Sequence, residues 1–167
     1  TCIIIDTTSA QIIMKKNSSK AQSLDQLINR LSIFKIPKLI YFDCNSYYNN
    51  KREVLDRIQQ EFNNDTVVVR SSSLSEDCKN SSSAGVYESV LNIKTREVDS
   101  VTCAINAVIN SYKKNNFYSQ YDQIIVQKMI KNTSMSGVIF THDLNTGAPY
   151  YVVNYDDQSG LTDTVTS

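Results

Sequence analysis

Residues 66–73 read Thr-Val-Val-Val-Arg-Ser-Ser-Ser, and this stretch decides the fold. Its β-branched residues follow one another without a polar break, which is typical of a strand buried on both faces. Such a strand needs strands on either side and helices above and below it. We therefore expect it inside a sheet, with Arg70 at its end, where a fixed positive charge can point into a cleft.

Predicted helices and strands surround this stretch. Apolar spacing predicts helices at about 20–32, 51–62 and 98–113, and further strands at 38–42, 86–93 and 124–130. Two short strands are expected at 2–6 and 11–14, and a hairpin of 137–141 with 150–155, joined by an Asn-Thr-Gly turn. This order predicts an α+β or mixed α/β lobe, of which we favour α+β with helices packed on a mixed sheet.

The first predicted helix has both a start signal and an apolar face. Ser18 or Ser19 can cap its N-terminus, because a serine hydroxyl accepts a hydrogen bond from a free backbone amide there. Helical spacing places its apolar residues on one face: Ala21, Leu24, Leu27, Ile28 and Leu31.

The composition argues against several classes of protein. The chain has 167 residues, with 17 Lys and Arg against 17 Asp and Glu, so it carries no broad charge for nucleic acid or for an anionic membrane. The ten tyrosines are not interleaved with basic residues as a nucleic-acid platform would need. No apolar run reaches the length of a membrane span, and the four widely spaced cysteines suit free thiols. We expect a soluble cytoplasmic protein.

The segment after the central strand has the chemistry of a phosphate site. Arg70 can make bidentate contacts, the serine hydroxyls and backbone amides that follow can donate hydrogen bonds, and Gly85 permits close backbone approach. The chain has no GxxxxGK[ST] pattern, so this is not a Walker A loop. Spacing alone leaves a second interpretation open, a solvated Ser-rich turn with a structural Arg–Asp pair.

Two ordered motifs resemble a known family. Residues 69–77 read VRSSSLSED and residues 83–93 read SAGVYESVLNI; residues 126–130 read VQKMI and residues 135–143 read MSGVIFTHD, followed by Thr146-Gly147. Together they are similar to the nucleotide-binding domain of phosphoenolpyruvate synthase and pyruvate phosphate dikinase. Lys20 stands where that family has the lysine of its leading loop, so the resemblance covers about 20–167.

The resemblance implies an ATP-grasp-like lobe and a set of roles. Lys20 and Arg70 would bind the phosphates of ATP within about 10 Å of each other, an estimate from hydrogen-bond reach, and Glu88 would orient one of them. The loop of Ser83, Ala84 and Gly85 would cover the terminal phosphates. The hinge facing the adenine edge would consist of Gln127, Met129 and Ile130. The implied chemistry is phosphoryl transfer from ATP with Mg²⁺, for which Arg70 would be catalytic.

The acceptor and the rest of the enzyme are implied less closely. Residues 1–167 would be the N-terminal part of the ATP-grasp domain, inactive alone, because the family's magnesium carboxylates and phosphohistidine domain come later in the chain. The acceptor would be pyruvate or the side-chain amide of L-glutamine, the latter because residues 151–157 and 163–167 resemble the L-glutamine kinases of capsule phosphoramidate synthesis. The alternative is a non-catalytic nucleotide-sensing or interaction module.

Several residues keep a plainer interpretation beside the functional one. The Gly-rich lead-in to Lys20 is replaced by Lys16-Asn17-Ser18-Ser19, so Lys20 could be a solvated surface lysine. Gln127 could be a polar residue of an edge strand. Asp156 and Asp157 could bind a metal or only end a strand. His142, the single histidine, is expected in the hairpin and outside the chemistry.

Overall fold

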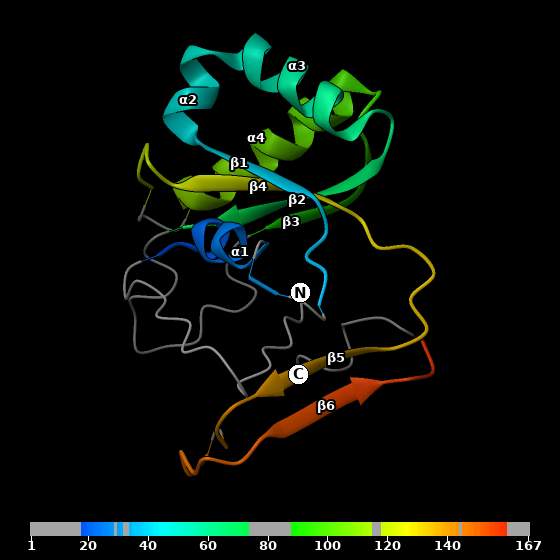
Figure 1. Ribbon diagram of the computed structural model, residues 1–167. Coiled ribbons are helices and arrows are strands. Elements are labelled where there is room, and N and C mark those ends of the chain that lie inside the picture. The colour runs from blue at the N-terminus through cyan, green and yellow to red at the C-terminus, as the bar shows by residue number, and fades with distance from the viewer. Residues whose placement is uncertain are drawn as a thin grey trace. The chain divides into compact units, whose positions relative to one another are not determined.

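The computed structural model describes residues 18–28, 30–31, 34–73, 88–114, 118–143 and 145–159 (Figure 1). The chain forms two compact units, one of Ile13–Leu31 with Lys35–Met129 and a smaller one of Thr1–Ile12, Ser32–Phe34 and Ile130–Ser167. The strands predicted at 2–6 and 11–14 lie outside the described residues.

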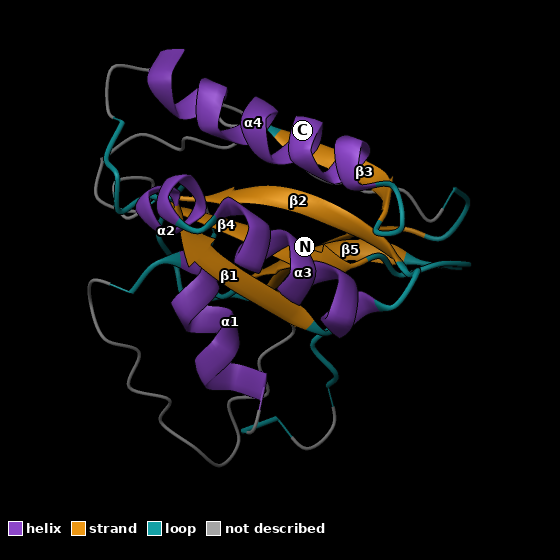
Figure 2. Cartoon of the chain, turned by 90° about the horizontal axis from the view of Figure 1, so that it is seen from above, coloured by secondary structure: helices purple, strands orange, loops and turns teal. Residues whose placement is uncertain are grey.

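A four-stranded antiparallel sheet organises the larger unit. Its strands are β1 (Leu39–Asp43), β2 (Thr66–Ser72), β3 (Ser89–Lys94) and β4 (Gln123–Lys128). They lie in the order β1-β4-β2-β3, which Figure 2 shows from above. The Val-rich strand β2 therefore lies inside the sheet, between β4 and β3, as predicted. The α+β fold class is confirmed, and all pairings among the described strands are antiparallel.

Helices cover both faces of this sheet. They are α1 (Lys20–Ile28), α2 (Cys44–Asn49), α3 (Lys51–Phe62) and α4 (Val98–Lys114). Figure 1 shows α2, α3 and α4 on one face and α1 on the other. The helices predicted at 51–62 and 98–113 are thus confirmed, and β2 has the two-sided cover that its sequence requires.

The main core lies between the sheet and the helices α2, α3 and α4. Alternate residues of three strands point into it, because side chains alternate along a strand: Ile40, Phe42, Val67, Val69, Ile124 and Val126. The intervening residues face α1, and here Val68 and Ile125 are also buried. Ala21, Leu24 and Leu27 of α1 are the buried residues that face them.

Helix α1 starts as its sequence indicates but ends earlier. The Gln22 N–H donates to Ser19 Oγ (3.2 Å) and the Ser19 N–H donates to Gln22 Oε1 (3.1 Å), which together form a capping box. The helix ends at Ile28, not near residue 32, and Ile28 is 39% exposed. Placing Ile28 on the buried face was therefore wrong, since the buried stripe of this short helix is the i, i+3, i+6 set that starts at Ala21.

The short helix α2 was not predicted. Its sequence, Cys-Asn-Ser-Tyr-Tyr-Asn, lacks strong helix formers. The signal was the preceding Asp43, whose carboxylate accepts the Ser46 N–H at 2.6 Å as an N-cap. Burial of Cys44 and Tyr47 against the core then stabilises a helix that local propensity does not favour.

The smaller unit contains the predicted hairpin, β5 (Ser136–Phe140) paired with β6 (Val152–Asp156). Gly137 is required where it stands, because a Cβ there would lie 2.8 Å from the backbone oxygen of Asn154. Across both units, no described helix combines the length and apolar character needed to cross a membrane.

Helix α4 should contribute heavily to stability. Ile105 is fully buried in its core face, so Ile105→Ala should lower the free energy of unfolding by about 2–5 kcal/mol. Val98→Ala, on the same helix at 40% exposure, is the control and should cost under about 1 kcal/mol. Urea denaturation followed by circular dichroism measures both. Equal losses would show that α4 is not the main cover of the sheet.

Candidate functional site

The candidate site lies at one end of the sheet in the larger unit, where β2 finishes and β4 begins. We call this the serine end and define it by residues 70–73 of β2 and its exit, Ser89 at the start of β3, and Asp122 and Gln123 at the start of β4. The antiparallel register places Arg70 opposite Ser89 on one side and Ile125 on the other. The central charge of the predicted phosphate site is therefore flanked by a strand on each side.

Arg70 and Lys20 belong to the same side of the sheet. Arg70 alternates with the core residues Val67 and Val69, so its side chain is on the α1 face, where it is partly exposed. Lys20 is the first residue of α1, and the next amide, Ala21 N–H, donates to Ser72 Oγ at 2.8 Å. Since Ser72 is two residues beyond Arg70 on the same face, the helix start lies at the serine end. The spacing of about 10 Å between the two cations stays a prediction.

The serines after Arg70 are buried and have a structural role. Ser71, Ser72 and Ser73 are all buried. Ser72 Oγ accepts the α1 amide, and Ser73 Oγ donates to Asp122 Oδ1 at 2.7 Å. Ser72 and Ser73 therefore connect β2 to its neighbours, and a contact of these serines with phosphate stays a prediction. A buried hydroxyl is retained at low cost only when it is hydrogen-bonded, which explains serine here.

Other predicted phosphate residues are placed only in part. The loop of Ser83, Ala84 and Gly85 lies outside the described residues. Glu88 is exposed just before β3, and its N–H donates to Ser111 Oγ of α4 at 3.3 Å. The structure thus fixes the backbone of Glu88 beside Ser89, the residue opposite Arg70, and a role for its carboxylate stays a prediction.

The predicted hinge residues lie at the opposite end of β4. Gln127 is 3% exposed and its Nε2 donates to the Pro37 carbonyl at 3.4 Å. Because β4 is an interior strand, the alternative that Gln127 is a polar residue of an edge strand is wrong. The Met129 N–H donates to the Thr66 carbonyl at 2.9 Å. Ile130 is 61% exposed, and the boundary between the two units falls between Met129 and Ile130.

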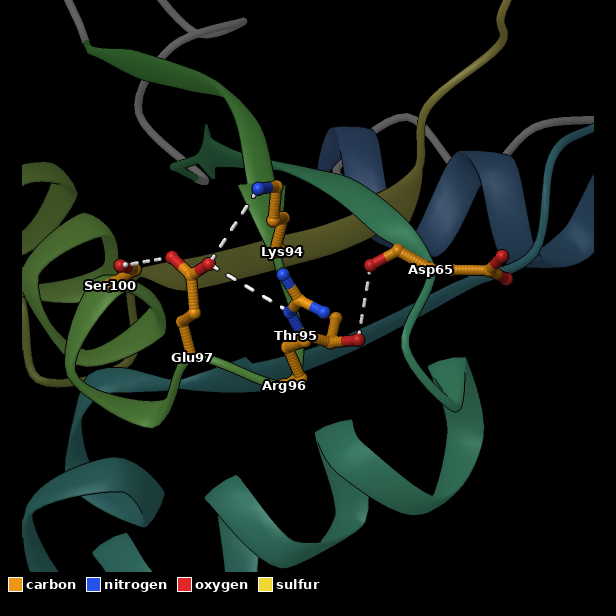
Figure 3. A network of polar contacts seen from close by, with 6 residues as sticks. All are labelled: Asp65, Lys94, Thr95, Arg96, Glu97 and Ser100. Carbon is orange, nitrogen blue, oxygen red and sulfur yellow. Dashed lines mark hydrogen bonds and ion pairs between the residues drawn. The ribbon is translucent and has the colours of Figure 1, made fainter.

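A polar network fastens this far end of the sheet (Figure 3). The backbone N–H and the hydroxyl of Thr95 both donate to the Asp65 carbonyl, each at 3.1 Å, which joins the end of β3 to the start of β2. Lys128 at the end of β4 adds an ion pair with Asp65 at 2.7 Å. The strand that leads to Met129 is therefore held at its last residue, although both charges are partly exposed and the pair adds little stability by itself.

Neither a metal cluster nor a deep cavity marks the described residues. Among them, no group of three His, Cys, Asp or Glu side chains could hold a metal ion. An open groove of about 380 Å³ runs along β1 and α3 and includes Tyr41, Gln123 and Arg57, but none of the predicted site residues. Asp156 accepts the N–H groups of Gln158 and Ser159, which supports its interpretation as the end of a strand.

Residues 143–147, at the end of the second sequence motif, form a tight turn in the hairpin of the smaller unit. Asp143 accepts hydrogen bonds from the Thr146 hydroxyl (2.7 Å), the Thr146 N–H (2.8 Å) and the Asn145 N–H (3.1 Å). These bonds, led by the hydroxyl, lower the pKa of the Asp143 carboxyl. Gly147 adopts the left-handed φ of 70° that closes the turn. His142 is exposed beside it, as expected of a hairpin residue.

The lowered pKa of Asp143 gives a test of this turn. Because the charged form is favoured, Asp143 stabilises the turn at neutral pH, and this contribution is lost as the pH falls through its pKa in the folded protein. The carboxyl should titrate below its ordinary value of about 3.9 in an NMR pH series, and Thr146→Val should move it upward. Thr141→Val is the control and should leave it unchanged. An ordinary pKa for Asp143 in the unaltered protein would contradict the hydrogen bonds that we describe for this turn.

Comparison with known proteins gives two matches. The model of the family described as "Pyruvate phosphate dikinase, AMP/ATP-binding domain" matches residues 46–160, which include Arg70, Glu88 and Met129. A Bacillus subtilis (strain 168) protein named "Uncharacterized phosphotransferase YvkC" is 41% identical over 92 residues, which is 47% of this chain and 11% of that protein. This chain thus corresponds to a small part of its longer relative. The family match covers well over half of the chain, which therefore belongs to the pyruvate phosphate dikinase AMP/ATP-binding domain family.

Proposed function

We propose that this chain is the ATP-binding part of a phosphotransferase and that the serine end of its sheet binds the phosphates. The observation that supports this most is the bond from the Ala21 amide to Ser72 Oγ, which holds the start of α1, and with it Lys20, on the face of the sheet that carries Arg70. Membership of an AMP/ATP-binding family agrees with two cations placed in this way. The same bond argues against Lys20 being an arbitrary surface lysine.

Arg70 has the more demanding role in this proposal. Its planar guanidinium can contact two phosphate oxygens at once, and it projects from an interior strand that cannot move away as charge develops. Phosphoryl transfer depends mainly on positioning and on stabilising the charge of the transferred group. We assign Lys20 to the same phosphates as a point charge, Ser83, Ala84 and Gly85 to a loop over them, and Glu88 to the orientation of Arg70 or Lys20.

We assign the adenine to the end of β4, where Gln127, Met129 and Ile130 follow one another closely. The Met129 N–H already donates to Thr66, so recognition of the base edge would fall to other groups of these residues. Residues 1–167 would then form the N-terminal part of an ATP-grasp domain.

The remaining parts of the reaction are assigned outside the described residues. Mg²⁺ would neutralise charge on the phosphates, but the described side chains do not form a site that fits it, so we assign its carboxylates to later parts of the chain. The relative is about nine times longer than the matched part, which leaves room for further domains such as a phosphohistidine domain. The acceptor would be a small molecule, pyruvate or the L-glutamine amide. We place the enzyme in the cytoplasm, which suits the free thiols Cys44 and Cys103.

The decisive variant is Arg70→Ala in the full-length protein. It should abolish ATP-dependent phosphoryl transfer, because no other group replaces the charge that β2 holds in place. Arg70→Lys should recover little, since a point charge does not reproduce the bidentate contact. Steady-state turnover of ATP measures both, once circular dichroism shows that the variants are folded.

His142→Ala is the matched control for this experiment. It removes an exposed side chain of the hairpin and should leave turnover nearly unchanged. Near-normal turnover in Arg70→Ala would reject the phosphate assignment. Binding of ATP without any turnover in the unaltered protein would favour the alternative, a nucleotide-sensing module.

Residues 1–167 alone should bind ATP weakly and with little dependence on Mg²⁺. Each missing charge-assisted contact costs about 1.5–3 kcal/mol, so the loss of two weakens binding by roughly two to four orders of magnitude. Calorimetric titration of the isolated chain and of the full-length protein gives the comparison. Equal affinities would show that the later regions contribute nothing to nucleotide binding.

A further inference from the structure

We infer that Tyr112 of α4 is a positioning residue that holds the last residues of β2, next to Arg70, in place at the proposed phosphate site. This inference rests on the proposed function, since it assigns a role at the same site. Tyr112 lies at the far end of α4 from Val98 and is only 1% exposed. Neither of the sequence motifs that point to a phosphate site includes it.

The hydroxyl of Tyr112 bridges two strands of the sheet. It accepts the Ser72 N–H at 2.8 Å and donates to the Gln123 carbonyl at 2.5 Å. Ser72 is the last residue of β2, Gln123 is the first of β4, and the two lie opposite each other in the register. The hydroxyl therefore links the two backbones at the point where β2 ends, two residues after Arg70.

The same residues connect the bridge to the start of α1. Ser72 Oγ accepts the Ala21 N–H, and Gln123 Oε1 accepts the hydroxyl of Ser19, the N-cap residue of α1, at 2.5 Å. Both residues that Tyr112 holds by their backbones therefore hold α1 by their side chains. A shift of either backbone would move Lys20 relative to Arg70.

A second buried contact, between Ser73 and Asp122, holds the residue that follows Ser72. Ser73 Oγ donates to Asp122 Oδ1, and Asp122 Oδ2 accepts the Ser119 N–H at 2.8 Å. Asp122 is itself buried and directly precedes Gln123, so its position depends on the same end of β4. Tyr112 and Asp122 thus fix consecutive residues, Ser72 and Ser73, from the side of the sheet opposite to α1.

Filling the core does not explain the hydroxyl. A phenylalanine would pack the same ring against α4 and the sheet, and a buried hydroxyl is unfavourable unless it is hydrogen-bonded. Both hydrogen bonds of the Tyr112 hydroxyl go to backbone groups, so they fix the positions of the two strands and not of a single side chain. The structure therefore favours a tyrosine here for the geometry of the serine end.

Tyr112→Phe in the full-length protein tests this inference, with ATP and adenosine as probes. The dissociation constant of each is measured by displacement of a fluorescent ATP analogue. The variant removes both hydrogen bonds of the hydroxyl, and we expect the value for ATP to rise about tenfold and that for adenosine to rise less than twofold. A role in general stability alone would affect the two probes alike.

Tyr47→Phe is the matched control. Tyr47 is buried in the same core, but its hydroxyl lies near Thr102 without a hydrogen bond of ordinary geometry among the described residues. Tyr47→Phe should leave the dissociation constants of ATP and adenosine unchanged. Asp122→Asn is the second variant in case Tyr112→Phe does not fold. It should also weaken the binding of ATP more than the binding of adenosine.

The outcomes separate this inference from the proposed function. An unchanged affinity for ATP in a folded Tyr112→Phe, or an equal loss for ATP and adenosine, would overturn the positioning role and leave the proposed function intact. Failure of the unaltered full-length protein to bind ATP would overturn the proposed function and this inference with it. Should Tyr112→Phe not fold, the same comparison for Asp122→Asn decides.

Discussion

The two-sided burial of β2 is the constraint on which the rest of the structure depends. Val67 and Val69 face α4, and Val68 faces α1, so the strand is stable only with helices on both faces. The helix that covers the second face starts at the serine end, because Ala21 is bonded to Ser72 there. Covering the strand and placing Lys20 on the face of Arg70 are thus consequences of one packing arrangement.

Polar groups then define how this apolar sheet ends. Tyr112, Asp122 and Ser73 are buried, and the bonds of Tyr112 and of Ser73 connect α4, the end of β2 and the start of β4. Unpaired, any of these groups would cost free energy in the interior, so the arrangement tolerates little variation. If the proposed function holds, a strand end fixed in this way suits the preorganised charge that phosphoryl transfer requires.

The two ends of β4 differ in how they are held. At the serine end the contacts are buried and come mainly from hydroxyl groups. The end near Met129 is held by backbone bonds, by the buried side chains of Thr95 and Gln127, and by a partly exposed pair, Lys128 with Asp65. Exposed ion pairs are weak and are screened by salt. The ion pair at the Met129 end should therefore weaken with added salt, whereas the buried hydrogen bonds at the serine end should not.

The sequence by itself determined the features that depend on neighbouring residues. These are the buried valine strand, a serine cap at Ser18 or Ser19, the helices at 51–62 and 98–113 and the hairpin turn, all set by local backbone preferences and apolar spacing. Only the tertiary structure decided that Ser72 and Ser73 are fasteners, that Gln127 is buried inside the sheet, and that Asp43 starts a helix. Ser72 is hydrogen-bonded to Ala21, which lies 51 residues away along the chain, and to Tyr112, which lies 40 residues away. A serine pattern specifies a hydroxyl but not its partner, because folding brings distant donors and acceptors together.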